Sequence, residues 1–251
     1  MNIAKRALRK ILRITLRGLN IDKEYSILIK QEKHRVNLLD KLNIELVLDV
    51  GANVGQYTYE LFSKGFAGRV ISFEPVSDMY KKLLVKSKSN DNWLVYEQCA
   101  VGEKEGEVEI NVSKNFESSS IFNVLERSIV AEPLTEFIKK ENVKVIKLSD
   151  IPEIKDYNKI HLKIDVQGYE EMVLKGAVEI FNKVSSLELE ISLVPLYDGA
   201  LLPEVLITKL KEYGFSPVFY TSAFNNASTG AIMQLDGFFI KNEYLDLVDD
   251  E

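Results

Sequence analysis

Short apolar runs alternate with amphipathic stretches along most of the chain. The apolar runs are rich in aliphatic residues, which predicts buried strands; they occupy residues 45–50, 69–73, 93–99, 161–165 and 186–191. Stretches with helical spacing lie at about 54–64, 77–87, 169–176 and 203–213. Two further segments, 216–220 and 237–241, predict a terminal antiparallel hairpin. The pattern predicts an α/β fold: a mostly parallel seven-stranded sheet with an antiparallel C-terminal hairpin strand and helices on both faces.

A long connection, residues 102–158, separates the third and fourth predicted core strands. It contains two strand-like pieces, 107–112 and 143–148, around a polar stretch that includes Ser118, Ser119 and Ser120. A connection of this length is typical of a functional loop or lid, so the serines are candidates for contact with a substrate, although an ordinary polar loop fits them equally. Because no proline- or glycine-rich linker interrupts the chain, we expect one domain over 43–251 after an N-terminal segment, 1–42.

The N-terminal segment predicts a basic amphipathic helix over residues 3–19. At 100° per residue its aliphatic side chains share one face, and six basic side chains lie opposite, with no acid in residues 1–20. Such a helix suits the headgroup region of an anionic membrane. The same pattern suits a helix whose apolar face docks on the domain or on a second subunit, so membrane contact and a homo-oligomer both stay open.

Composition narrows the classes of protein that this chain fits. The net charge of -6 disfavours nucleic acid as a partner. The single cysteine, Cys99, excludes an intrachain disulfide, and with only two histidines a His/Cys zinc site is not expected. No apolar run approaches the ~18 residues that span a bilayer, and basic residues interrupt any secretory h-region. We therefore expect a cytoplasmic protein. Any peripheral membrane contact is expected at the inner face of the membrane.

A glycine-rich turn follows the first predicted strand, and it has the spacing G-x-N-x-G. Gly51, Ala52, Asn53 and Gly55 form it, where a strand passes into a helix whose N-terminal N–H groups face a ligand. Asp49 precedes the first glycine by two residues. A pyrophosphate would be repelled by Asp49, whereas the ammonium of a methionine moiety would be attracted, directly or through water. The turn therefore favours S-adenosylmethionine (SAM) over NAD.

An acid ends the second predicted strand. Glu74 lies 23 residues past Gly51, and a carboxylate on the neighbouring strand tip accepts hydrogen bonds from both hydroxyls of a ribose. The turn and the acid together indicate a nucleoside-containing cofactor. Pro75, Cys99 and Ala100 complete the expected cofactor site, with Cys99 as a small wall near the adenine ring and not as a nucleophile.

Four blocks of sequence resemble the FkbM family of methyltransferases. They comprise the turn at 49–55, the strand end at 73–75, the residues 162–170 and the residues 173–177. The resemblance extends from about 46 to 241, because 234–239 is similar to the family's closing strand, and it leaves the basic helix outside. It implies a class I, Rossmann-like fold and SAM-dependent methylation, mostly of oxygen atoms in polyketides, sugars and glycolipids.

Two acids at the predicted edge of the sheet are candidates for catalysis. Asp165 ends the fourth core strand and faces the methionine end of SAM or the acceptor hydroxyl; alternatively, it caps the helix that begins near Tyr169. Glu190 lies near the end of the next strand and alternates with Glu188 on one face. Either Asp165 or Glu190 is expected to remove the hydroxyl proton. A divalent cation held by these acids and Asp236 is a less favoured alternative, and no metal ligand is assigned.

The histidines are interpreted as structural. His161 is expected in the buried start of a strand with satisfied hydrogen bonds, and His34 on the surface, although helix 31–41 extends toward the site. The sequence thus predicts a SAM-dependent O-methyltransferase acting on a hydroxyl of a saccharide, glycolipid or related natural product. Two alternatives are an NAD-linked oxidoreductase on the same fold and a non-catalytic scaffold at a membrane, since fold alone does not guarantee activity.

Overall fold

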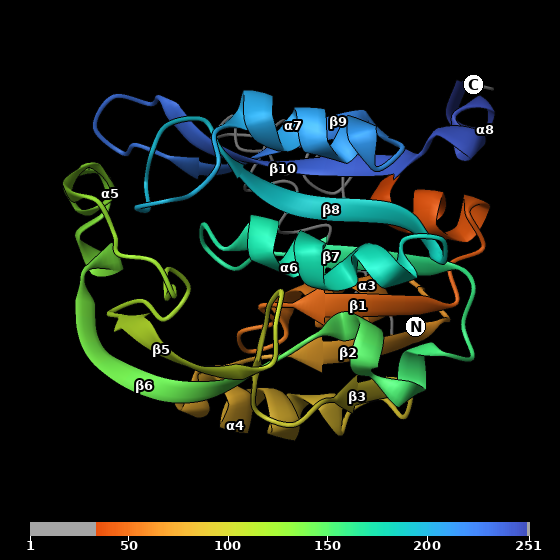
Figure 1. The fold of residues 1–251 in the computed structure, drawn as a ribbon, viewed down its shortest axis with the longest axis horizontal. Helices are drawn as coiled ribbons and strands as arrows, with labels where there is room; N and C mark the ends of the chain where they lie inside the picture. Colours follow the sequence, from red (N-terminus) through yellow and green to blue (C-terminus); the bar gives the residue numbers. More distant parts are fainter. Residues whose placement is uncertain (1–33, 250–251) are drawn as a thin grey trace, which may run out of the picture.

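A computed structural model describes residues 34–249, and a seven-stranded sheet forms its centre (Figure 1). The predicted helix at 3–19 and most of segment 1–42 lie outside the described residues, whereas 34–41 are helical. The strand order is β3-β2-β1-β7-β8-β10-β9. The strands are β1 (Leu46–Val50), β2 (Arg69–Phe73), β3 (Trp93–Val95), β7 (Ile160–Ile164), β8 (Val184–Ser192), β9 (Phe215–Asn225) and β10 (Ile232–Lys241).

The pairing of the strands confirms the predicted fold class. Neighbours from β3 to β8 run parallel, whereas β10 pairs antiparallel with both β8 and β9. The strand order reverses between β1 and β7, where the chain leaves the sheet in opposite directions, and ligands of open α/β sheets bind beside the carboxyl ends of strands at such a point. Topology alone therefore marks the ends of β1 and β7 as the place to look for a site.

Helices cover both faces of the sheet, as predicted. The longer helices are α3 (Gln56–Ser63), α4 (Ser77–Ser87), α6 (Glu170–Ala177) and α7 (Pro203–Glu212). Residues 46, 48 and 50 of β1 face one apolar cluster with α6 and α7, and Val47 faces another with α3, α4 and helix 34–41. This alternation along β1 is the period of two expected of a strand that is buried on both sides. Among residues 34–249, no helix is long and apolar enough to cross a bilayer.

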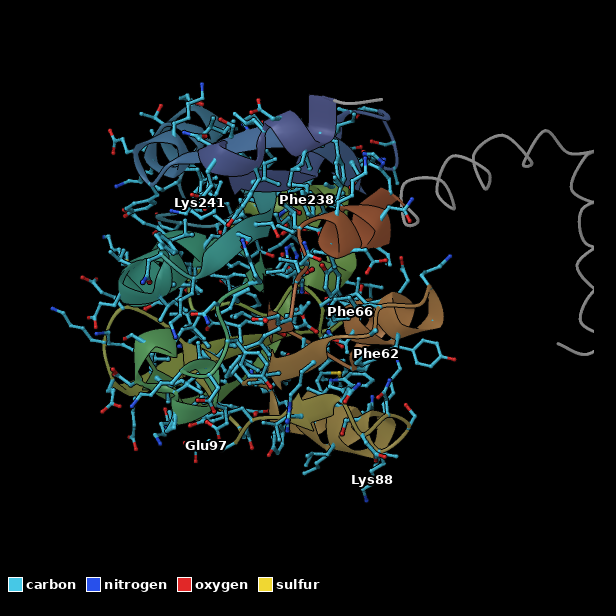
Figure 2. All side chains as sticks on the ribbon, turned by 90° about the vertical axis from the view of Figure 1, so that its right-hand side faces the viewer. Phe62, Phe66, Lys88, Glu97, Phe238 and Lys241 are labelled. Atoms are coloured by element: carbon cyan, nitrogen blue, oxygen red, sulfur yellow. The ribbon has the colours of Figure 1, made fainter. Side chains whose placement is uncertain are left out.

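Figure 2 shows the apolar cluster on the face of the sheet that α3, α4 and helix 34–41 cover. The rings of Phe62 and Phe66 lie 6.3 Å apart, and Phe62 lies 6.1 Å from the ring of Trp93. Phe238 of β10 belongs to the same apolar cluster, whereas Lys88 and Glu97 point into solvent (Figure 2). Aromatic side chains from α3, β3 and β10 therefore belong to one core layer.

The long connection contributes two strands, β5 and β6, to a second, three-stranded sheet of order β4-β6-β5, whose strand β4 comes just before the connection. Its strands are β4 (Ala100–Val101), β5 (Gly106–Ser113) and β6 (Phe137–Ile146), with the short helix α5 (Glu126–Ala131) between the last two. Both strand pieces predicted in this connection are present, and β6 starts six residues earlier than the predicted piece. The second sheet curves away from the first and faces it across the ends of β1 and β7 (Figure 1).

The predicted strand at 93–99 is wrong in its second half. β3 ends at Val95, and the chain crosses to the second sheet, where Ala100 and Val101 pair with β6. Glu97 is exposed and pairs with Lys144 of β6 at 2.6 Å. This polar contact lies where the chain passes from the first sheet to the second. The prediction considered only the apolar residues on either side of Glu97. The chain ends with the short helix α8 (Asp246–Asp249) after β10.

Candidate functional site

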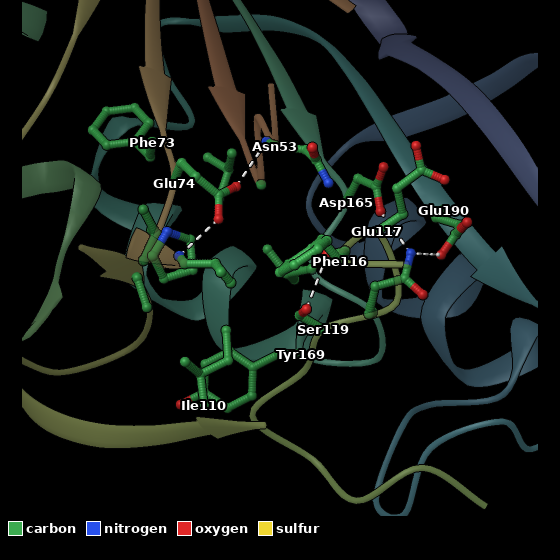
Figure 3. A pocket seen from close by; sticks show the side chains of 18 of the residues that line it. Asn53, Phe73, Glu74, Ile110, Phe116, Glu117, Ser119, Asp165, Tyr169 and Glu190 are labelled. Atoms are coloured by element: carbon green, nitrogen blue, oxygen red, sulfur yellow. Dashed lines mark hydrogen bonds between the residues drawn. The ribbon is translucent and has the colours of Figure 1, made fainter. Parts of the chain in front are cut away.

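A cavity of about 370 Å³ lies at the carboxyl ends of β1, β2, β7 and β8, between the two sheets (Figure 3). Most of the residues predicted to bind a cofactor or to act in catalysis line it: Gly51, Asn53, Glu74, Pro75, Cys99, Ala100, Asp165 and Glu190. Asp49, Ala52 and Gly55 do not line it. The cavity's size is that of a small-molecule site, and its walls combine apolar side chains with acids, amides and hydroxyls.

The glycine at the end of β1 is required by a close approach of two strand ends. Gly51 has φ +76°, and a Cβ there would lie 1.8 Å from the carbonyl oxygen of Asp165. Its N–H donates to the carbonyl of Phe73, which ties the turn to β2. Gly55 has φ +75°, and a Cβ there would lie 2.5 Å from Trp93. The first glycine therefore shapes the cavity wall, and the second packs the turn against the core.

Glu74 is held in place by two backbone donors. The N–H of Asn53 donates to Oε2 and the N–H of Val76 to Oε1, each at 2.7 Å (Figure 3). Burial raises the pKa of Glu74 to about 7, although both backbone hydrogen bonds lower it. Each carboxylate oxygen can accept two hydrogen bonds, so each keeps a free lone pair at the cavity. The group is thus preorganised as a double acceptor.

Asp49 lies behind the turn and not at the cavity surface. It is 0% exposed, and its Oδ2 accepts hydrogen bonds from Thr58 Oγ1 at 2.7 Å and Ser72 Oγ at 3.3 Å. Its Oδ1 lies 3.3 Å from Lys163 Nζ. The expected direct contact between Asp49 and an ammonium in the cavity does not fit this burial. Water-mediated contact stays a prediction.

Lys163 is a site residue that the sequence analysis missed. It is 8% exposed, donates to the carbonyl of Gly51 at 3.1 Å, and lies between Asp49 and Asp165, whose Oδ2 is 3.5 Å away. Burial lowers the pKa of Lys163, but the two carboxylates outweigh it and hold the pKa above the ordinary lysine value. A lysine inside a predicted buried strand was the available signal, because such a charge needs a buried partner.

An amide joins the two candidate catalytic acids. Gln167 Nε2 donates to Asp165 Oδ1 at 2.8 Å and to Glu190 Oε2 at 2.7 Å (Figure 3). Gln234 Nε2 donates to the same Oε2 of Glu190 at 2.6 Å. Asp236, which is opposite Glu190 in the register of β10 and β8, also lines the cavity. Burial and the neighbouring charge of Asp165 raise the pKa of Glu190 well above its ordinary value, and burial raises that of Asp236 to about 7.

Gln167 is fixed on every polar side-chain atom. Its Oε1 accepts from the hydroxyl of Tyr197 at 2.7 Å, and its backbone carbonyl accepts from Ser120 Oγ at 2.6 Å. Its φ of +55° lies in the left-handed region, which costs a non-glycine residue about 1 kcal/mol or more. The surrounding contacts hold this strained residue between two carboxylates. We found no sequence signal for this role beyond its place next to Gly168.

The alternative role of Asp165 as a helix cap is not what the structure shows. The side chain of Asp165 makes no cap to α6, and the helix carries its own carboxylate at this end. The N–H of Gly168 donates to Glu170 Oε1 at 3.0 Å. Asp165 therefore does not cap α6, and its side chain faces the cavity (Figure 3).

Glu188, the other acid of β8, belongs to a buried network with Arg35 of helix 34–41 and Tyr57 of α3. Arg35 Nε donates to Glu188 Oε2 at 2.8 Å and Arg35 Nη2 to Oε1 at 2.6 Å, and the Tyr57 hydroxyl donates to Oε2 at 2.9 Å. His161 is fully buried between Ser186 Oγ, at 2.7 Å, and the Tyr57 hydroxyl, at 3.0 Å. The prediction of a satisfied core histidine is confirmed, and Glu188 is the paired acid of its strand.

The remaining predicted residues fall at the edges of the site. Burial raises the pKa of the Cys99 thiol to about 12, which leaves it unreactive and fits a wall residue. Ser119 lines the cavity and Ser118 a second cavity beside it, while Ala52 lines a third. His34 is exposed, with its ring against Phe219 at 5.4 Å. Among residues 34–249, no group of three or more acids, histidines or cysteines is arranged to hold a metal ion.

The mostly parallel sheet carries a glycine turn and several acids at the ends of its strands, around one cavity. This arrangement is typical of Rossmann-like α/β domains. More particularly, the Methyltransferase FkbM domain family matches residues 49–217, and the chain belongs to this family. The predicted family is therefore confirmed. No curated protein matches the chain in sequence.

Solved structures with a similar arrangement include methyltransferases. A methyltransferase FkbM from Methylobacillus flagellatus KT is 16% identical with a TM-score of 0.46, and the match covers 77% of this chain and 43% of that one. Magnesium protoporphyrin IX methyltransferase from Synechocystis PCC 6803, solved with SAM, is 12% identical with a TM-score of 0.47, covering 88% and 81%. 1,6-Didemethyltoxoflavin-N1-methyltransferase from Burkholderia thailandensis, solved with S-adenosylhomocysteine (SAH), is 13% identical with a TM-score of 0.45, covering 94% and 89%. The chain thus spans less than half of the Methylobacillus protein.

Proposed function

We propose that this protein is a SAM-dependent O-methyltransferase that methylates a hydroxyl of a saccharide, a glycolipid or a related natural product. The observation that carries the proposal is Glu74, a carboxylate fixed by two backbone amides with its free lone pairs at a cavity beside the Gly51 turn. Two adjacent acceptors in fixed positions suit the paired hydroxyls of a ribose, the part that SAM shares with other nucleosides.

The rest of the cavity fits the other parts of SAM. Cys99, Ile110 and Phe116 give an apolar wall next to Glu74, suited to an adenine ring. Gly51 leaves the backbone bare in the same cavity, and Lys163, which lines the third cavity, holds the carbonyl of Gly51 from the side away from it. When bound, SAM supplies an electrophilic methyl group. The protein's task is then to align an acceptor oxygen with that methyl in a dry cavity.

Glu190 is the better placed of the two candidate bases. Its Oε2 is occupied by two amide donors, whereas its Oε1 has no hydrogen bond within residues 34–249. The two amides fix the carboxylate, and Oε1 is left to take the proton of a hydroxyl. A raised pKa makes the ionised carboxylate a stronger base than an ordinary glutamate. Asp165 then positions Glu190 through Gln167 and adds negative charge beside it.

Transfer of a labelled methyl group tests this function. The protein is incubated with methyl-labelled SAM and a lipid and glycan extract, and the products are separated and hydrolysed. We expect label in base-stable, hydroxyl-linked methyl groups, and its loss by about 100-fold or more in Glu190→Gln, the usual scale for one acid–base group. The rate should rise with pH as Glu190 ionises, and this rise should be absent in the variant. Label in nitrogen- or carboxyl-linked methyl groups alone contradicts the proposed acceptor class.

Peripheral contact with the cytoplasmic face of a membrane, through residues 3–19, is part of the same proposal. The support is the basic amphipathic pattern of that segment, which would bring the site near a lipid-linked acceptor. Vesicles with and without anionic lipid test it by flotation. We expect binding only to anionic vesicles and its loss in Arg9→Glu/Arg13→Glu. Retention of a dimer with no flotation would instead favour docking on a second subunit.

A further inference from the structure

A second cavity of about 350 Å³ adjoins the proposed cofactor cavity on the side of the acids. Its walls come from residues 115–135 of the connection, from Tyr197, and from the β9–β10 hairpin. The two cavities share only Glu117, Gln167, Glu190 and Ala223, and none of the turn around Gly51 or the region of Glu74. The second cavity therefore opens onto the proposed base and not onto the proposed nucleoside site.

Glu190 is the one described residue that lines all three cavities around the site. Asp165 and Asp236 line only the other two cavities, so Glu190 is the candidate base that a hydroxyl in the second cavity can reach. A molecule that fills the second cavity is thus placed for proton transfer to Glu190.

A serine side chain stands in the wall of this cavity. Ser128, in α5, is 2% exposed and is among the residues that line the cavity. A hydroxyl both donates and accepts, so Ser128 offers a polar ligand in this cavity a hydrogen-bond partner.

The charges that line the cavity select its ligand. Glu117, Glu132 and Glu190 are its ionisable side chains apart from Tyr197, and no lysine, arginine or histidine is among the described lining residues. Amide and hydroxyl groups make up most of the other polar surface, with the aromatic ring of Phe224 on one side. Such a wall suits hydroxyl groups, which both donate and accept, and it repels phosphate and carboxylate.

We propose that the second cavity holds the part of the acceptor that carries the reacting hydroxyl, that this part is an uncharged, hydroxyl-rich ring, and that anionic rings are excluded. This inference rests on the proposed function, since it assigns the acceptor side of the same site. It assigns the residues between β5 and β6 to acceptor selection, with Gln167 as the positioning residue between acceptor and cofactor.

Saturation-transfer NMR with a matched pair of sugars tests the inference without knowledge of the natural acceptor. The probes are methyl β-D-glucopyranoside and methyl β-D-glucuronide, equimolar, with the full chain and saturating SAH. The two differ only in a hydroxymethyl against a carboxylate. We expect the neutral sugar to receive at least about tenfold more saturation, the scale of one like-charge repulsion in a partly screened site.

Variants tie the preference to this cavity. Glu117→Gln/Glu132→Gln should raise the glucuronide signal toward that of the glucoside, and Ser128→Ala should lower the glucoside signal. Glu107→Gln/Glu126→Gln is the matched control, because both glutamates are exposed and line none of the three cavities. Thermal unfolding confirms that each variant folds.

Equal signals from the two sugars, a stronger glucuronide, no saturation of either, or an equal effect of the control pair would overturn the inference. Calorimetry of SAH binding to the same samples distinguishes a failure of the cavity assignment from a failure of the proposed function. If SAH binds and the sugars do not behave as stated, the cavity assignment alone fails. If SAH does not bind, the proposed function fails as well.

Discussion

The buried pair between Arg35 and Glu188 offers a severe test of the structure. The side chains of Arg35 and Glu188 are 14% and 6% exposed, and two nitrogens of Arg35 bond both carboxylate oxygens. The pair joins helix 34–41 to β8, 153 residues apart in the chain. Arg35→Met keeps most of the aliphatic volume but leaves Glu188 as a buried charge without a cation.

The expected loss is about 3–5 kcal/mol in the free energy of unfolding, the usual cost of removing one partner of a buried ion pair. Arg35→Met/Glu188→Gln should recover much of it, because the second change removes the stranded charge. Arg69→Met, at an exposed position, is the control and should cost less than about 0.5 kcal/mol.

The pH dependence of this loss has a defined sign. Burial alone raises the pKa of Glu188, but Arg35 and His161 outweigh it and hold the pKa at about 2, below the ordinary 4.5. The stabilisation from this depressed pKa is present above pH 4.5 and is lost as the pH falls toward 2. Without Arg35 the pKa rises, so the difference between wild type and variant should shrink from pH 7 to pH 4.

Equilibrium unfolding in urea at the two pH values measures these quantities. A loss below about 1 kcal/mol for Arg35→Met at pH 7, or a loss that the Glu188→Gln change does not reduce, would refute the buried pair.

Two further predictions concern the cofactor side of the site. Gly51→Ala should abolish SAH binding and lower the free energy of unfolding by about 2 kcal/mol or more, because the added Cβ would overlap the carbonyl of Asp165. Gly106→Ala is the control: the space around Gly106 is open, so this change should alter neither quantity. Calorimetry measures the binding, and unfolding in urea measures the stability. Burial raises the folded pKa of Glu74 to about 7 from an ordinary 4.5, so the free energy of unfolding should fall as the pH rises between these values. Glu74→Gln should reduce that slope by up to about 1.4 kcal/mol per pH unit, and an unchanged slope would argue against the shift.

The strands and the main site could be predicted because both follow from local patterns. Apolar runs located β1, β2, β7 and β8 to within about two residues. Parallel strands bring their carboxyl ends to one edge, so the sequence predicts that Gly51, Glu74, Asp165 and Glu190 lie together. The structure places all four around one cavity.

Long-range pairing could not be predicted in the same way. Gln234 meets Glu190 because of the register between β10 and β8, and Arg35 meets Glu188 across the whole domain. Sequence spacing defines which face of a strand a residue occupies, but it does not define which distant residue lies opposite. For the same reason the contact between Asp49 and Lys163 on the adjacent strand could not be predicted.

Calorimetry of SAH binding tests the central claim most directly. Wild-type protein should bind SAH and not NAD, and Glu74→Ala should weaken SAH binding by at least about 1.5 kcal/mol, because it removes a charged acceptor of two hydroxyl hydrogen bonds. Glu97→Ala, an exposed glutamate outside the cavity, should leave the affinity unchanged. Binding of NAD in place of SAH, or equal SAH affinity in wild type and Glu74→Ala, would contradict the assignment of this cavity to SAM.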